Sequence, residues 1–173
     1  MKPTERFIFE LGREKDPLGR PIQPEEVPGL VEGLRTRLGT SSQELDLTPK
    51  SLKTLELKLV KFKEILDQEG QSLSEEELAV FIRQIAAYLG EVFVIHAKGY
   101  WDQRMISLSN SGVAFEGEWE YIKDGELRSS QGMVVVMGWW AARVWDEIIL
   151  GEKPKIYRDY KRALANPGRE YLN

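Results

Sequence analysis

The sequence predicts an α+β fold with N-terminal helices, a three-stranded antiparallel meander and C-terminal helices packed on one sheet face. Apolar residues recur every three to four positions over residues 24–96 and again over residues 139–165, which is the period of a helix. Over residues 100–137 the period changes to two, which is the period of a strand. Helices and strands that are segregated along a chain are typical of α+β domains.

The composition fits one globular domain that is large enough to bury a core. The chain has 173 residues, of which 42% are hydrophobic and 30% charged. Its net charge of −4 gives no overall attraction to phosphate backbones or anionic lipids, so neither a nucleic-acid nor a membrane partner is expected. The one basic run, residues 153–162, is interrupted by Asp159 and is interpreted as a solvated helix face.

The absence of cysteine excludes disulfides, thiolate nucleophiles and metal sites built on thiolates, and it fits a reducing compartment. The N-terminus lacks the apolar segment of a signal peptide. No uninterrupted apolar run has the roughly 20 residues that span a bilayer. We therefore expect a soluble cytoplasmic protein, and the sequence sets no oligomeric state.

The chain divides into an N-terminal arm over residues 1–23, a single α+β domain over residues 24–166 and a tail over residues 167–173. In the N-terminal part Phe7 and Phe9 alternate with other residues, which fits a short edge strand. The alternative is a segment that lies loosely over the domain.

Three helices are predicted before the meander. The first runs from Pro24, or from Pro28 one turn later, to Gly39. The second follows Thr48 as its cap and ends at Gly70. Its apolar stripe consists of Leu52, Leu55, Leu59, Phe62 and Leu66.

The third helix has the clearest start, because Ser74 and Glu77 form the pattern of a capping box and Leu73 can pack on Leu78. Its apolar surface extends over several sides, which is typical of a central helix. We expect its most buried residues to be Leu78, Ile82, Ile85 and Leu89. A strand over residues 91–95 is the less favoured alternative.

The meander consists of predicted strands over residues 100–108, 113–121 and 127–137, with Asp124-Gly125 as a hairpin turn. A two-residue turn there places Glu120 opposite Ser129. Two helices follow, from Trp139 to Leu150 and from Pro154 onward.

Residues 87–92, Ala-Tyr-Leu-Gly-Glu-Val, with a tryptophan at position 101, resemble a motif of a family of uncharacterised bacterial α+β domains. The Thr-Pro-Lys-Ser-Leu start at residues 48–52, the hairpin and the short final helix with its tyrosines belong to the same resemblance, which covers about residues 45–165. The resemblance implies no catalytic residue and no activity. Some small bacterial domains of this style are immunity or partner-binding proteins, which is an analogy of fold.

Acidic residues on one strand are the first candidate for chemistry. Glu116, Glu118 and Glu120 alternate, so they share one face of the strand, and paired carboxylates can bind a hard cation or divide acid and base roles. The positions predicted to lie opposite hold no second carboxylate and no histidine. A solvated face is therefore favoured, and no metal site is expected. No glycine-rich phosphate loop occurs, so no cofactor is expected either.

The only histidine, His96, continues the apolar stripe of the third helix, and Arg104 lies on the first predicted strand. An enzyme or small-ligand binder would use Glu118 and Glu120 with these two residues in a cleft between sheet and helix. This is the alternative hypothesis, because a histidine near a helix C-terminus also has a structural use.

The leading hypothesis is a non-enzymatic protein-interaction module, immunity-like or regulatory, and it rests on the lack of a catalytic set of residues and on a surplus of tryptophan. All five tryptophans lie in the second half of the chain: Trp101, Trp119, Trp139, Trp140 and Trp145. Tryptophan is enriched at binding hot spots. Trp139 is rotated by about 100° from Trp140 on the same helix, so Trp139 is expected to be partly exposed and to contact a partner, together with Trp101 and Trp119.

Overall fold

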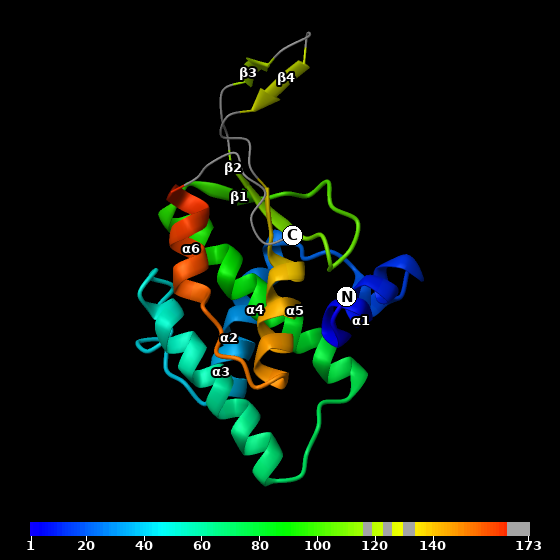
Figure 1. The fold of residues 1–173 in the computed structure, drawn as a ribbon, viewed down its shortest axis with the longest axis vertical. Helices are drawn as coiled ribbons and strands as arrows, with labels where there is room; N and C mark the ends of the chain where they lie inside the picture. Colours follow the sequence, from blue (N-terminus) through cyan, green and yellow to red (C-terminus); the bar gives the residue numbers. More distant parts are fainter. Residues whose placement is uncertain (116–118, 123–125, 130–133, 166–173) are drawn as a thin grey trace.

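The computed structural model describes residues 1–115, 119–122, 126–129 and 134–165, with side chains for residues 1–115 and 135–165. Figure 1 shows its elements. Its α-helices are α1 (Pro3–Arg13), α2 (Val27–Leu38), α3 (Ser51–Gln68), α4 (Glu75–His96), α5 (Met137–Ile149) and α6 (Ile156–Ala165). Two short 3₁₀ helices, η1 (Pro17–Gly19) and η2 (Pro24–Glu26), connect α1 to α2.

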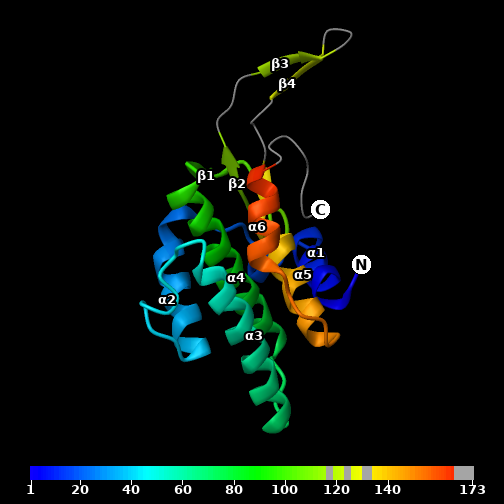
Figure 2. The same cartoon turned by 60° about the vertical axis from the view of Figure 1, so that its left-hand side comes forward.

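The described strands form two antiparallel sheets. They are β1 (Gly99–Trp101), β2 (Gly112–Phe115), β3 (Trp119–Ile122), β4 (Glu126–Ser129) and β5 (Val134–Val136). The first sheet has three strands in the order β1-β2-β5, and the second pairs β3 with β4. Helices pack on this sheet, which confirms the predicted α+β fold (Figures 1 and 2).

The β2–β5 pairing and the β3–β4 pairing are separated by the same number of residues on both strands. Gly112 pairs with Val136 in the sheet, and Ile122 pairs with Glu126 at the far end of β3 and β4. Four residues separate the ladders on each strand, 115–118 on one and 130–133 on the other.

The predicted register of Glu120 is wrong by one residue. Glu120 lies opposite Arg128, and Ser129 lies opposite Trp119. The ladder ends at the pair Ile122 and Glu126, so three residues connect the strands where a two-residue turn was predicted. Glu116 and Glu118 lie outside the described residues.

The central helix of the core is α4. The capping box is present, because Ser74 Oγ accepts a hydrogen bond from Glu77 N and Glu77 Oε1 accepts one from Ser74 N. The helix continues to His96, so the alternative strand over residues 91–95 is wrong. By length and composition α4 could cross a membrane, but 72% of its most apolar window is buried inside the protein. This is the pattern of a core helix.

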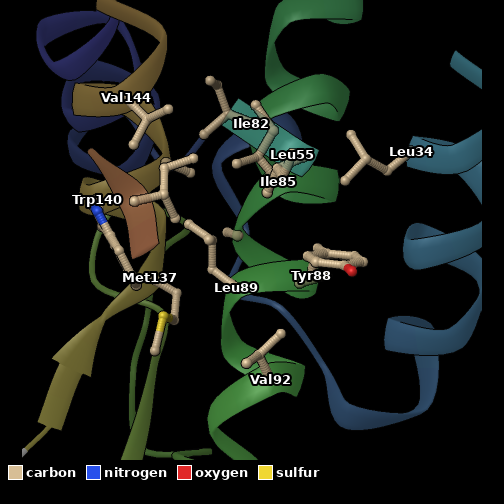
Figure 3. Packing of buried hydrophobic residues seen from close by; sticks show 14 of the residues in the cluster. Leu34, Leu55, Ile82, Ile85, Tyr88, Leu89, Val92, Met137, Trp140 and Val144 are labelled. Atoms are coloured by element: carbon tan, nitrogen blue, oxygen red, sulfur yellow. The ribbon is translucent and has the colours of Figure 1, made fainter. Parts of the chain in front are cut away.

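Figure 3 shows side chains of α4 between those of α5 and α2. Ile82, Ile85 and Leu89 have no exposed surface, as predicted. Leu78 is only half-buried, which corrects the prediction for that residue. It lies in the first turn of α4, next to the exposed capping residues, where fewer neighbours cover it.

The N-terminal residues form a helix, so the edge strand suggested by Phe7 and Phe9 is wrong, and so is the alternative of a segment that lies loosely over the domain. Pro3 stands in the first turn of α1, where a missing N–H costs nothing. Ile8 and Leu11 are buried, and α1 packs against α5. Their spacing of three residues places them on one helix face, which outweighs the local alternation of Phe7 and Phe9.

Candidate interaction surfaces

Two described strands, β3 and β4, project beyond the helices (Figures 1 and 2). We call residues 119–122 and 126–129 the hairpin arm. A two-stranded hairpin on its own is at best marginally stable in water. The hairpin arm is therefore the part of the described fold that a bound partner would stabilise most.

The register of the hairpin arm groups its positions by face. Trp119 pairs with Ser129 at one end of β3 and β4. Paired residues, and residues two positions away from them along each strand, share one face of the ladder.

The next pair on that face of the hairpin arm consists of Tyr121 and Leu127. Trp119, Tyr121 and Leu127 therefore share one face of the β3–β4 ladder. Figures 1 and 2 show that the described helices end before they reach these positions. An apolar face without a cover is typical of a binding surface.

The other face of the hairpin arm carries the charged positions Glu120, Arg128 and Glu126, together with Ile122. Glu120 and Arg128 are directly opposite, at the spacing that favours pairs of opposite charge. The alternation of apolar and charged positions is thus maintained along the hairpin arm.

A second surface is a groove between α3 and the end of α5, with a volume of about 680 Å³. Apolar side chains from both sides line it, including Leu57, Val60 and Ile148. Leu57 is 64% exposed, and Leu150, just after α5, is 55% exposed. Exposed aliphatic side chains of this size on two neighbouring elements form a surface that a partner can cover.

The groove borders a basic face formed by α3 and α6. Lys53 and Lys161 hold their Nζ atoms 4.8 and 4.6 Å from the centre of the Tyr157 ring, within the range of cation–π attraction. The backbone N–H of Tyr157 donates to Glu56 Oε1 at 2.9 Å, which ties the start of α6 to α3. Excess positive charge therefore lies beside the groove.

Trp139, the residue emphasised by the sequence, is half-buried on α5. Its ring meets the ring of Phe9 edge-on, with centroids 6.4 Å apart, and Phe9 is 42% exposed. Trp140 and Trp145 are buried in the core. The expected partial exposure of Trp139 is confirmed, and the α1–α5 surface is a third, smaller aromatic surface.

Trp101 belongs to the core edge. It is buried in β1 against Gly90 of α4, and its Nε1–H donates to Glu91 Oε2 at 3.3 Å. Because Gly90 has no side chain, the indole ring packs directly on the α4 backbone. Trp101 thus holds the sheet against α4.

Arg104 and His96, which the enzyme hypothesis combines, lie in different surroundings. Arg104 donates to both carboxylate oxygens of Asp102, at 2.9 and 2.7 Å, and this interaction lowers the pKa of Asp102. His96 is exposed in the last turn of α4. Within the described chain, no group of three or more histidine, aspartate or glutamate side chains could hold a metal ion.

Sequence reasoning missed the groove because its walls come from distant segments. One signal was available, since Leu57 is a large apolar residue outside the buried stripe of Leu52, Leu55 and Leu59. A helix that is apolar on a second side can use that side to pack against another element or to bind a partner.

The fold and these surfaces define a small α+β protein with a projecting hairpin. No family model, no curated protein and no solved structure matches the chain. Its function is therefore argued from its own surfaces.

Proposed function

We propose that this protein is a non-enzymatic protein-interaction module, of an immunity-like or regulatory kind, and that the hairpin arm is its recognition surface. The observation that carries the proposal is the register of the hairpin arm. It places Trp119, Tyr121 and Leu127 on one face of β3 and β4, two strands that lie beyond the described helices. Large aromatic residues on such a face are the usual anchors of protein interfaces.

The stability of a two-stranded hairpin supports the same proposal. Two strands without a covering layer bury little apolar surface, so the hairpin alone is only marginally stable. A partner that covers its apolar face buries that surface, which stabilises the hairpin and favours the complex. The charged positions of the other face, Glu120 and Arg128, keep that side compatible with water.

The enzymatic alternative has less support. It requires Arg104 and His96 to converge on the strand glutamates. Arg104 is engaged with Asp102, and His96 is exposed at the end of α4. No further observation favours this alternative over the interaction module.

A pull-down from the organism that encodes the chain tests the proposal. The tagged protein is compared with the arm variant Trp119→Ser/Tyr121→Ser and with Tyr100→Ser, which removes a 46% exposed aromatic residue outside the hairpin arm. We expect the arm variant to lose the captured protein and Tyr100→Ser to retain it. Circular dichroism confirms that both variants keep the helical fold.

A third variant, Trp139→Ala, separates the two aromatic surfaces. Retained capture is expected if the hairpin arm is the contact. Loss of capture with Trp139→Ala, together with retention by the arm variant, would move the contact to the α1–α5 surface. Equal capture by all variants would overturn the proposal.

A further inference from the structure

We infer that a hollow between the end of α2 and the middle of α3 binds a small monocarboxylate with an apolar body. The α2–α3 hollow has a volume of about 320 Å³ and is lined by residues 36–39 and by Lys58, Lys61, Phe62 and Ile65. It lies on the part of the molecule away from β3 and β4, where α2 and α3 are neighbours (Figures 1 and 2). The inference therefore goes beyond the proposed function and does not rest on the hairpin arm.

The lining of the α2–α3 hollow is basic, although the whole chain has a net charge of −4. Its charged side chains are those of Arg37, Lys58 and Lys61, and none of the described side chains that line it is acidic. Charges of one sign around a concave, partly apolar surface raise the local concentration of ions of the opposite sign. The lining thus favours an anionic group.

Arg37 is held in place by α4. Its Nε–H donates to Gln84 Oε1 at 3.1 Å, and its guanidinium carbon lies 5.6 Å from the centre of the Phe81 ring. The two terminal guanidinium nitrogens make no hydrogen bond within the described part of the chain. Two parallel N–H donors match the two oxygens of a carboxylate. Because the side chain is already ordered, binding costs it little further entropy.

The two lysines lie three residues apart and therefore share one side of α3. Lys61 makes no hydrogen bond or ion pair with the described residues. Lys58 Nζ lies 3.1 Å from Glu44 Oε2, but the two side chains are 28% and 45% exposed. An ion pair that is open to water contributes little, so a ligand can compete with Glu44 for Lys58.

Negative charges near the α2–α3 hollow reduce its attraction for anions but do not cancel it. Glu44 pairs with Lys58, and Glu77 interacts with Arg37 at longer range. The C-terminus of α2, which Gly39 caps, adds the negative end of a helix dipole, equivalent to about half a charge. Even at full strength, two carboxylates and half a charge are fewer than the three cations of the lining. The small positive excess suits a monoanion.

The remaining lining is apolar. Phe62 is half-buried, and its ring centroid lies 5.2 Å from that of the buried Phe81. Leu38 of α2 is half-buried, and Ile65 of α3 is 40% exposed. An apolar ligand body that covers these side chains removes their exposed surface from water. Cations beside an apolar surface therefore favour an amphiphile over an inorganic anion.

The size of the α2–α3 hollow limits the size of the ligand. Its volume of about 320 Å³ lies at the lower end of the range for small-molecule sites, roughly 300–1,000 Å³. A folded partner does not enter such a hollow. Octanoate, a straight-chain carboxylate, is therefore a suitable probe.

An NMR titration of the isotope-labelled protein with octanoate tests the inference. We expect saturable shifts of the backbone amides of residues 36–39 and 58–65. Octanol lacks the charge, and inorganic phosphate lacks the apolar body, so each should bind about tenfold more weakly, equivalent to about 1.4 kcal/mol. Affinity for phosphate equal to that for octanoate would indicate a site for any anion, and equal affinity for octanol would show that the cations do not contribute. Either result would overturn the inference.

Variants of α3 separate the α2–α3 hollow from unspecific binding to lysine side chains. Lys58→Gln/Lys61→Gln should weaken octanoate binding by about tenfold, and Ile65→Ser by about fivefold. The matched control Lys50→Gln/Lys53→Gln removes the same charge from the start of α3, outside the hollow, and should retain the affinity. All of these side chains are at least partly exposed, so the fold should persist, which circular dichroism checks. Equal losses with the two lysine pairs, or a titration without saturation, would contradict the inference.

Discussion

Asp146 of α5 caps the first turn of α1 through Thr4, although 142 positions separate the two residues. Asp146 Oδ1 accepts a hydrogen bond from Thr4 N at 2.9 Å, and Oδ2 accepts one from Glu5 N at 3.1 Å. The carboxylate is fully buried. It satisfies two N–H groups that have no partner within their own helix, and its charge complements the helix dipole. Arg143 adds an ion pair with Glu5 at 3.6 Å.

Asp146→Ala should therefore destabilise the fold by about 1–3 kcal/mol, because it leaves two buried donors without an acceptor. Urea denaturation measures the loss, and amide exchange should show it first in α1. Asp146→Asn retains one side-chain oxygen and should cost less. A change for the alanine variant within roughly 0.5 kcal/mol, the range of ordinary surface substitutions, would show that the cap contributes little.

The core position of α4 gives a second prediction. Ile85→Ala should cost about 2–5 kcal/mol, since it removes a fully buried side chain and leaves a cavity. Leu78→Ala, on the same helix but half-buried, is the matched control and should cost clearly less. Equal losses in denaturant titration would contradict the described difference in burial.

Two glycines in helices should respond in opposite directions to alanine. A Cβ at Gly90 would lie 2.3 Å from Cη2 of the buried Trp101, so Gly90→Ala should overpack this contact and cost about 1–3 kcal/mol. A Cβ at Gly29 of α2 meets no atom within 4 Å, and Gly29→Ala should stabilise by about 0.4–1 kcal/mol. Thermal unfolding of the two variants is the measurement. A stable Gly90→Ala protein would mean that Trp101 packs elsewhere.

The ion pair of Asp102 and Arg104 predicts a pH dependence. Hydrogen bonds from Arg104 hold the pKa of Asp102 below its ordinary value. A carboxyl whose pKa is lower in the folded than in the unfolded state stabilises the fold above its unfolded pKa. That stability is lost as the pH falls through the folded pKa.

Arg104→Ala should raise the pKa of Asp102, which a carbon-detected NMR titration follows directly. The variant should be less stable than the unmodified chain at neutral pH, and the difference should vanish in acid, where Asp102 is protonated in both proteins. A stability difference that does not change with pH would assign the effect of Arg104 to packing.

Helices with strong periodicity and local caps were predictable from the sequence. The capping box of Ser74 and Glu77 is built from neighbours in the sequence, and Gly39 and Gly70 end their helices with positive φ angles. Such signals are local, so they do not depend on how the chain packs.

Features that depend on distant residues were not predictable in this way. The cap of α1 comes from Asp146, so the sequence near Pro3 contains no sign of it. The register of the hairpin differs by one residue because three residues, not two, connect Ile122 to Glu126. The groove forms only when the end of α5 lies beside α3.

Candidate residues were predicted with mixed success for the same reason. The rotation between neighbouring helix positions correctly predicted that Trp139 is partly exposed and Trp140 buried, because this difference follows from local geometry. The partner of Arg104 could not be predicted from strand alternation, since residues 102–111 form a loop in which Asp102 binds it. That Trp119 and Tyr121 share a face with Leu127 became visible only through the pairing of β3 with β4.

Amide hydrogen exchange on the hairpin arm tests the central claim most directly. The exchange of the free, dilute protein is compared with that of the same protein bound to the partner that it captures. The account predicts that amides of residues 119–122 and 126–129 become protected on binding, while those of α1, away from the arm, remain unchanged. Unchanged exchange in the hairpin arm, with protection confined to α1 and α5, would contradict the account.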